Sequence, residues 1–393
     1  MTDQTLSDIN VLPDSPEERS LRESLRVLSN LLVDLVRRAK RKAAKGQVVL
    51  VMPCVSDAYI GTWPDDALYP FMALPDLVDV GELTEHLAFL ASSVLDLPYV
   101  PDRIEQDGLP ILSPGAAGSA PMTDRMPLHL PAAWIRLLDY YQSFGVHVAR
   151  KEEWARLIIR SFERVPFSCG LAYADPQRPP IGFGFYDSIR ISGHELMSSL
   201  MLYRGFQRAA VLFADVVDQN TLATWRHRAE AIRVNIDRCY DEDQGGFVGG
   251  TRLGRQFSVW ANGLIFPLAS AGQQAAIMDT LRRHRDAIFL HGCTRQVSEV
   301  EGWKGSPAPG GYQNGGFWAT GTGYVLPAIA AKDPVWATEL ATELVDYIAG
   351  IDIAEWIDVE GRPHGARQFL ASVAVPILGL RCILERKSLI QCM

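Results

Sequence analysis

The chain has 393 residues, of which 48% are hydrophobic and 21% charged, an ordinary composition for a globular protein. This length exceeds that of a usual single domain and predicts either two domains or one large toroid or barrel. The net charge of −8 argues against a polyanionic partner such as nucleic acid. Six scattered cysteines without a CxxC pair are typical of buried thiols in a reducing compartment, not of a disulfide framework.

The first 20 residues are polar and acidic, and we expect them to form a flexible N-terminal segment without a secretory signal. No apolar run reaches the ~20 residues that span a bilayer. We therefore expect a cytoplasmic protein with no membrane partner, whose residues 21–393 form a single domain. A homo-oligomer is left open.

Apolar residues at helical spacing from Leu21 to Ala39 predict a first helix over 21–45, ended by a basic turn and Gly46. The stretch "QVVLVMP" (47–53) has the composition of a short strand. Further helical patterns follow at 80–95, 131–145, 150–164, 192–217, 221–239, 257–270, 274–286, 316–331, 334–349 and 366–387.

Helices 257–270 and 366–387 are apolar nearly all round, which indicates buried inner elements. Helices 221–239 and 334–349 carry one apolar and one charged face and should lie outside. This alternation predicts an all-α fold, an (α/α)6 toroid of six helical hairpins with few short strands. Its cavity should lie where the loops before the inner helices converge, at 54–79, 98–130, 165–191, 288–318 and 355–368.

Familiar metal and cofactor motifs are incomplete. The stretch "HELMS" (194–198) has Ser198 where a zinc protease needs its second histidine. The stretch "DEDQGGF" (241–247) would place Arg252 where a calcium loop has its glutamate. No dinucleotide or phosphate-loop fingerprint is complete. We expect neither a metal nor a cofactor.

Acidic and amide side chains gather instead in aromatic-rich loops. These loops are "GTWPDDALYPF" (61–71), "VPDRIEQDGLP" (100–110), "GFGFYDSIRISG" (182–193), "SEVEGWKG" (298–305), "GGYQNGGFW" (310–318) and "EWIDVEGRPHGARQF" (355–369). Desolvation by aromatic rings raises the pKa of a carboxyl, so such a group can protonate a leaving oxygen while a second carboxylate activates water. This division of labour is that of glycoside hydrolysis.

The chain resembles six-hairpin (α/α)6 glycosidases, in particular the inverting clan with alkaline/neutral invertases, mannosylglycerate hydrolases and processing α-glucosidases. The resemblance rests on "FYDSIRISGHELMSSLMLYRGFQRAA", "YQNGGFW" and "EWIDVEGRPHGARQFLASVAVPILGL". It implies Asp187 as the general acid and Glu301 as the water-activating base, with Glu299 as a rival base. The stretch "TWPDD" has Asp65 where the family has an arginine, which leaves the sugar open.

The implied activity is inverting hydrolysis of a small glycoside or short oligosaccharide in a deep pocket. The residues predicted to bind the substrate are Tyr59, Trp63, Asp65, Asp66, Asp102, Arg103, Tyr186, Arg190, Trp303, Tyr312, Gln313, Asn314, Trp318, His364 and Gln368. Glycines at 310, 311, 315 and 316 should let the chain turn into the next helix, and Gly321 and Gly323 should allow that helix to pack closely.

Two alternatives stay open. The first is a sugar isomerase or 2-epimerase on the same fold, which would move protons with histidines such as His194, His291 and His364. The second is a non-catalytic carbohydrate-binding toroid.

Overall fold

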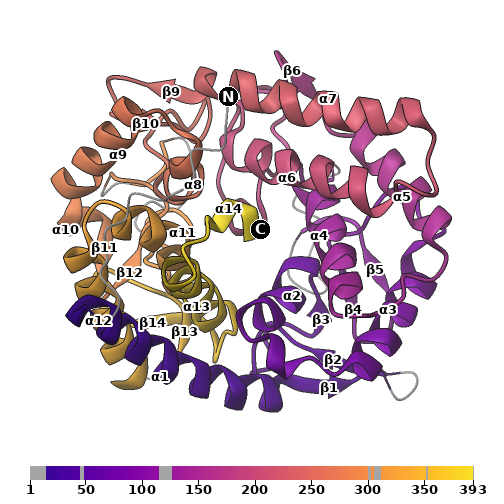
Figure 1. The fold of residues 1–393 in the computed structure, drawn as a ribbon, viewed down its shortest axis with the longest axis horizontal. Coiled ribbons are helices and arrows are strands. Elements are labelled where there is room, and N and C mark those ends of the chain that lie inside the picture. The colour runs from indigo at the N-terminus through magenta and orange to yellow at the C-terminus, as the bar shows by residue number, and fades with distance from the viewer. Residues whose placement is uncertain are drawn as a thin grey trace.

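Helices alternate along the chain between an outer and an inner ring (Figure 1). The computed structural model describes residues 15–44, 48–114, 126–299, 302–304, 311–350 and 353–392. The outer helices are α1 (Pro16–Ala39), α3 (Val80–Val94), α5 (Lys151–Glu163), α7 (Gln219–Asn235), α9 (Ala271–Arg283) and α12 (Pro334–Gly350). The inner helices are α2 (Pro64–Ala73), α4 (Leu130–Ser143), α6 (Leu196–Leu212), α8 (Val259–Ile265), α11 (Ala319–Ala330) and α13 (Ala371–Leu384).

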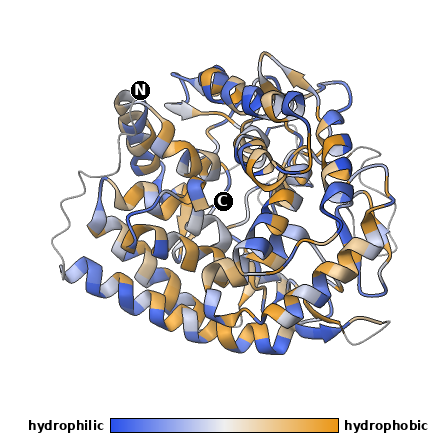
Figure 2. Cartoon of the chain, turned by 45° about the vertical axis from the view of Figure 1, so that its right-hand side comes forward, coloured by the Kyte–Doolittle hydropathy of each residue, from blue (hydrophilic) through white to orange (hydrophobic). Residues whose placement is uncertain are grey.

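Each inner helix packs against the next one along the chain, and α13 packs against α2, which closes the ring. The all-α toroid expected from the sequence is thereby confirmed. Figure 2 shows hydrophilic and hydrophobic residues interspersed along the outer helices. One face of each outer helix packs against the inner ring. In α11 and α13, by contrast, almost every residue is buried. No helix in the described part of the chain combines the length and the apolar character needed to cross a membrane.

Gly321 and Gly323 are contact points of the inner ring, as expected. A Cβ atom on Gly321 would lie 2.0 Å from the Trp260 indole of α8, and one on Gly323 would lie 2.2 Å from the Val375 carbonyl oxygen of α13. Because these distances are far below van der Waals contact, any side chain here would push neighbouring helices apart.

The start of the chain differs from the prediction. Helix α1 begins at Pro16, because the Ser15 side chain caps it by accepting from the Glu18 backbone N–H. It ends at Ala39, and strand β1 (Lys40–Lys42) pairs with β2 (Val49–Val51), so the helix expected to reach residue 45 is too long. Helix α2 was not predicted, because prolines at its start and at position 70 obscure its ten-residue pattern.

Short antiparallel strands precede every inner helix. They are β3 (Gly61–Thr62), β4 (Arg103–Glu105) and β5 (Pro110–Ile111), then β6 (Phe167–Ser168), β7 (Leu171–Ala174) and β8 (Gly193–His194), then the hairpins β9 (Tyr240–Asp241) with β10 (Gly246–Phe247), β11 (Phe289–Leu290) with β12 (Cys293–Thr294) and β13 (Ala354–Ile357) with β14 (Pro363–Arg367). These hairpins hold side chains over the inner-helix N-termini, at one end of the ring.

Candidate active site

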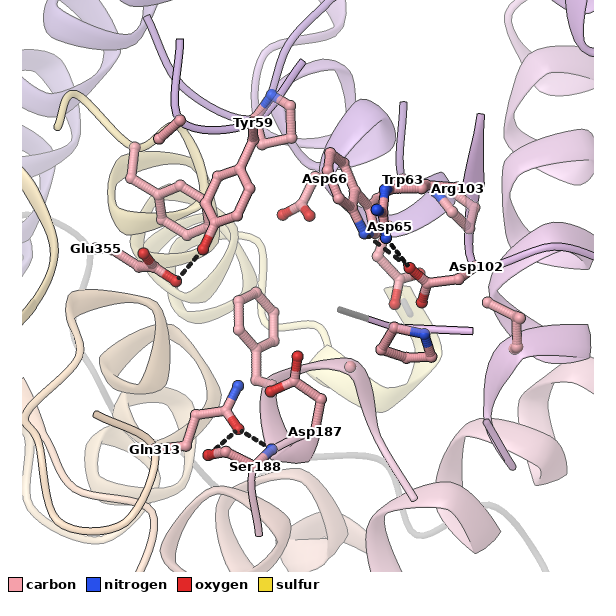
Figure 3. Close-up of a pocket in the computed structure, with 18 of the residues that line it drawn as sticks. Tyr59, Trp63, Asp65, Asp66, Asp102, Arg103, Asp187, Ser188, Gln313 and Glu355 are labelled. Carbon is pink, nitrogen blue, oxygen red and sulfur yellow. Dashed lines mark hydrogen bonds and ion pairs between the residues drawn. The ribbon is translucent and has the colours of Figure 1, made fainter. Parts of the chain in front are cut away.

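A cavity of about 320 Å³ opens at this end of the ring. Residues from the segments before α2, α4, α6, α11 and α13 line it, which are the loops that the sequence singled out. Figure 3 shows carboxyl groups directed into the space from several of these segments. The cavity therefore brings together acids that are far apart in the chain.

Asp187 lies in the lining, directly after a 3-10 helix (Gly184–Tyr186) that turns the chain toward α6. Its Oδ1 atom is buried without a hydrogen-bond partner. Burial raises the pKa of this carboxyl to about 7, and the negative charges of Asp102 and Glu355 act in the same direction. A hydrogen bond from Gln313 opposes the rise. At neutral pH, Asp187 is therefore poised to give up a proton.

The amide of Gln313 is held by Ser188. Its Oε1 atom accepts from the Ser188 backbone N–H and from the Ser188 hydroxyl, both at 2.8 Å. This arrangement turns the amide nitrogen of Gln313 toward Asp187, as Figure 3 shows. Gln313, in the segment before α11, thus orients the carboxyl of Asp187, in the segment before α6.

Glu355 is the second acid of the cavity with a well-defined orientation, and it lies on β13. Its Oε1 atom accepts from the Tyr59 hydroxyl at 2.9 Å and from the Tyr312 hydroxyl at 3.2 Å, and its Oε2 atom accepts from the Ala366 backbone N–H at 2.9 Å. Burial raises the pKa of Glu355, whereas these three donors lower it. They also fix the carboxylate in one orientation.

A second acidic wall comes from α2 and from the residue just before β4. Asp102 accepts from the Trp63 indole N–H at 3.1 Å and from the Arg103 guanidinium at 3.3 Å, and burial raises its pKa to about 6. The Oδ1 atom of Asp66 is buried and unpartnered, and burial together with the charge of Asp65 raises the pKa of this carboxyl well above the ordinary value. This wall can accept or exchange hydrogen bonds with sugar hydroxyls.

Asp65 is the third acid of this wall. Its Oδ1 atom pairs with the buried Arg136 guanidinium of α4, and its Oδ2 atom lies 3.7 Å from His129 Nε2. His129 Nδ1 lies 3.0 Å from the Gly182 carbonyl oxygen, to which it can donate. Asp65, which stands where the resemblance expects an arginine, is therefore paired with the Arg136 guanidinium, and Arg136 itself does not line the cavity.

Eight of the predicted site residues line the cavity along with Asp187: Tyr59, Trp63, Asp65, Asp66, Asp102, Arg103, Tyr312 and Gln313. Seven do not, namely Tyr186, Arg190, Trp303, Asn314, Trp318, His364 and Gln368. Glu301 lies outside the described residues. Glu299 is described, but its carboxylate lies beside Gln256 and Lys304 and not in the lining.

The aromatic residues among these seven are packed in the core. Tyr186 and Trp318 are almost fully buried, with the Tyr186 hydroxyl 3.3 Å from Ser258 Oγ and the Trp318 indole donating to the Tyr312 carbonyl. Trp303 is buried as well, and its backbone N–H donates to the Asn314 side chain, which makes Asn314 a structural link.

The other three lie at the periphery. His364 stacks on Trp356 with ring centroids 4.5 Å apart and bonds Asp358 at 2.9 Å. Gln368 accepts from Arg38 at 3.2 Å, on the outer side of the hairpin. Arg190 is exposed.

Sequence reasoning did not select Glu355, Glu105, His129 or Ser188 as site residues, although all four line the cavity. Glu355 stood among the loop acids noted in the sequence. No local signal separates it from Asp358 or Glu360 of the same hairpin, because the tyrosines that hold it come from other segments. In the described part of the chain, no cluster of three or more His, Cys, Asp or Glu side chains is arranged to hold a metal ion.

No protein-family description matches the sequence, and no curated protein matches it. Solved structures do match. A wild-type glycosidase matches with 15% identity over 95% of this chain and 99% of that chain, with a TM-score of 0.58. A glycosidase variant in complex with glucose matches with 15% identity over the same shares, with a TM-score of 0.61.

The GH63 mannosylglycerate hydrolase from Thermus thermophilus in complex with glucose matches with 14% identity over 89% of this chain and 99% of that chain, with a TM-score of 0.58. At such low identity the likeness concerns the fold. The chain therefore has the six-hairpin glycosidase-like fold that the sequence motifs indicated.

Proposed function

We propose that this protein is an inverting glycoside hydrolase in which Asp187 is the general acid and Glu355 is the general base. The observation that carries the proposal is a cavity with one carboxyl that holds its proton near neutral pH and a second, oriented carboxylate. Inverting glycosidases need this pair, with the carboxyls about 6.5–9.5 Å apart so that a water fits beside the sugar. The fold shared with glycosidases gives independent support.

In the proposed reaction, the glycosidic oxygen lies against Asp187, which lines the cavity and whose Oδ1 atom has no hydrogen-bond partner in the protein. Asp187 protonates this oxygen as the bond to the anomeric carbon breaks. Glu355 takes a proton from a water that attacks the opposite face of the sugar. The Tyr59 and Tyr312 hydroxyls both donate to Oε1 of Glu355, so the carboxylate keeps a constant orientation while it accepts the proton.

The substrate we propose is a small glycoside with an uncharged glycone. Four carboxyl groups with raised pKa values face the cavity, those of Asp66, Asp102, Asp187 and Glu355. Among the described lining residues, Arg103 is the one Arg or Lys, and Asp102 and Glu105 already pair with it. A glycone with a carboxylate or phosphate would find no free counter-charge here, and each of these carboxyls would repel it once ionised.

The base assigned here differs from the one implied by the sequence resemblance. Glu355 is favoured because it lines the same cavity as Asp187, whereas Glu299 does not. An isomerase or 2-epimerase gains no support, because His129 is the single histidine among the described lining residues. His194, His291 and His364 do not belong to the lining.

The experiment compares purified wild-type protein with Asp187→Asn and Glu355→Gln on a panel of disaccharides, glycosylglycerates and aryl glycosides, including uronides. Released sugar is measured, and NMR follows the anomer that appears first. We expect inversion and a loss of at least about 10³-fold in kcat for each variant. Uronides should be turned over more slowly than the matching neutral glycosides.

Substrates with different leaving groups distinguish the general acid Asp187 from the general base Glu355. Asp187→Asn should regain most of its activity on glycosyl fluorides, whose leaving group needs no proton, whereas Glu355→Gln should not. Asp358→Asn is the matched control, because Asp358 lies in the same β13–β14 hairpin but outside the lining. Glu301→Gln tests the alternative base. Full activity of Glu355→Gln, or retention of the anomer, would overturn the assignment; sugar binding without product over long incubation would indicate a carbohydrate-binding protein.

A further inference from the structure

The C-terminal helix α14 (Leu389–Cys392) lies at the end of the ring opposite to the cavity. Helix α13 starts two residues after Phe369, which lines the cavity, and its 14 residues carry the chain about 21 Å away. After a four-residue connection, α14 folds back and contacts α6, α8 and α13. In Figure 1 it lies across the middle of the ring. We call α14 and its connection, residues 385–392, the C-terminal plug.

The plug is held by side chains of the inner ring. Leu389 and Ile390 are buried under the inner helices. Arg204 donates to the Gln391 carbonyl oxygen at 3.0 Å, and Arg208 donates to the Cys392 carbonyl oxygen at 3.0 Å. The Tyr140 hydroxyl donates to the same carbonyl. These contacts place the Cys392 side chain at one position on the inner ring.

That position brings Cys392 against Cys382 of α13. The two Sγ atoms lie 3.5 Å apart, at the contact distance of unbonded sulfur atoms. Cys382 is buried and Cys392 is partly exposed, so a solvent-borne reagent reaches Cys392 first. The other four cysteines are not paired in this way: Cys54, Cys239 and Cys293 are buried, and Cys169 is exposed.

We propose that Cys382 and Cys392 form a reversible disulfide that staples the C-terminal plug to the inner ring, by exchange with a low-molecular-weight disulfide such as oxidised glutathione. The Cys392 thiolate attacks one sulfur of the reagent and releases one glutathione thiol. Cys382 then loses its proton and attacks Cys392 Sγ, which releases the second glutathione. Two protein thiols are oxidised, and one reagent disulfide is reduced to two thiols.

The surroundings suit this order of attack. The hydrogen bond from Cys382 lowers the pKa of Cys392 to about 7, and the positive charges of Lys387 and Arg208 act in the same direction. The pKa of Cys382 is raised, by the adjacent Cys392 and by burial. Cys392 is therefore the attacking thiolate and Cys382 the resolving thiol. In a reducing compartment the dithiol form prevails, and the staple forms under oxidation.

The test uses the full chain, treated with oxidised glutathione and digested with trypsin without reduction. Trypsin cleaves after Arg381, Arg386 and Lys387, so Cys382 and Cys392 fall on separate peptides, 382–386 and 388–393, with one cysteine each. We expect these two peptides to appear linked, and to separate on reduction with dithiothreitol. The oxidised protein should melt about 2–4 °C higher, because the bond restricts the unfolded chain.

Serine variants assign each step. In Cys382→Ser, Cys392 should carry a stable glutathione adduct and the melting temperature should not rise. In Cys392→Ser, the buried Cys382 should stay unmodified. Cys169→Ser, which removes the exposed competitor, should form the linked peptides as the wild type does. Two results would overturn the proposal: both thiols staying free, or Cys392 in the wild type keeping glutathione without linkage to Cys382.

Discussion

The Tyr59 hydroxyl donates to Glu355 Oε1 at 2.9 Å, although 296 residues separate the two in the chain. Tyr59 belongs to the segment before the first inner helix, and Glu355 to the hairpin before the last. They meet because α13 packs against α2 and closes the ring. The proposed base therefore owes its orientation to ring closure.

Removal of the Tyr59 hydroxyl should shift the dependence of kcat on pH. The Tyr59 hydroxyl lowers the pKa of Glu355, so Tyr59→Phe should raise it. Because a general base works as the carboxylate, the acid limb of kcat should move to higher pH, by about 0.5–1.5 pH units. The measurement is kcat against pH on the best substrate. Tyr347→Phe is the control, since Tyr347 bonds Gly361 outside the cavity; an unmoved acid limb in Tyr59→Phe would contradict the proposed role of Glu355.

The alkaline limb of activity should report Asp187. A general acid works while it carries its proton, so kcat should fall as pH rises through the pKa of about 7 that burial gives this carboxyl. On glycosyl fluorides, which need no protonation, the same limb should weaken or vanish. A limb at the same pH with both substrates would mean that another group controls it.

The Asp187 carboxyl should make the stability of the folded protein depend on pH. Its pKa in the folded protein, about 7, is above the ordinary value of 3.8, so the folded state binds the proton more tightly than the unfolded state does. Its contribution is present at low pH and is lost as pH rises from about 4 to about 7. Asp187→Asn should therefore melt at a higher temperature than the wild type at pH 8, with little difference at pH 4.5. Equal differences at both pH values would contradict this expectation.

The Asp65–Arg136 pair can be tested by a double-mutant cycle. Each partner is buried, so Arg136→Met or Asp65→Asn leaves the other group without its partner and should cost about 3–5 kcal/mol in urea unfolding. The double variant removes both groups and should cost clearly less than the sum of the single losses. Additive losses would show that the two groups do not stabilise each other.

Gly323→Ala should loosen the inner ring. The added Cβ would lie 2.2 Å from the Val375 carbonyl oxygen and 2.8 Å from the Pro376 nitrogen, both backbone atoms of α13 that cannot rotate away. We expect a loss of about 1–3 kcal/mol in the free energy of unfolding. Gly272→Ala is the matched control, because no atom lies within 4 Å of the added Cβ in the outer helix α9. Gly272→Ala should be neutral or stabilising by up to about 1 kcal/mol.

Sequence patterns were most informative where the evidence is local. Periodicity separated buried helices such as α13 from two-faced ones such as α12, because burial imposes its pattern on each helix over a few turns. Gly321 and Gly323 were identified as packing glycines from their place inside an apolar helix. Asp187 was selected from its aromatic neighbours and its resemblance to the family motif, and its role as the acid stays a prediction.

The sequence does not distinguish tryptophans of the core from tryptophans that line the cavity. Trp303 and Trp318 lie in glycine-rich loops beside polar residues, a setting as typical of a sugar platform as of a packed core. Both are buried away from the cavity, whereas Trp63 lines it. The sequence around a buried tryptophan and around a cavity-lining one therefore looks alike. Which of the two it becomes depends on the distant segment that covers its indole.

Most helices (α2 excepted), the inner and outer rings and the acid-rich loops could thus be derived from residues close together in the chain. Which acids share one cavity could not. Asp187 and Glu355 face the same space because five segments converge when α13 meets α2, and the pKa of each depends on the burial and charges that this convergence creates. Long-range packing sets both the distance between charges and the loss of solvent, and no local pattern records either.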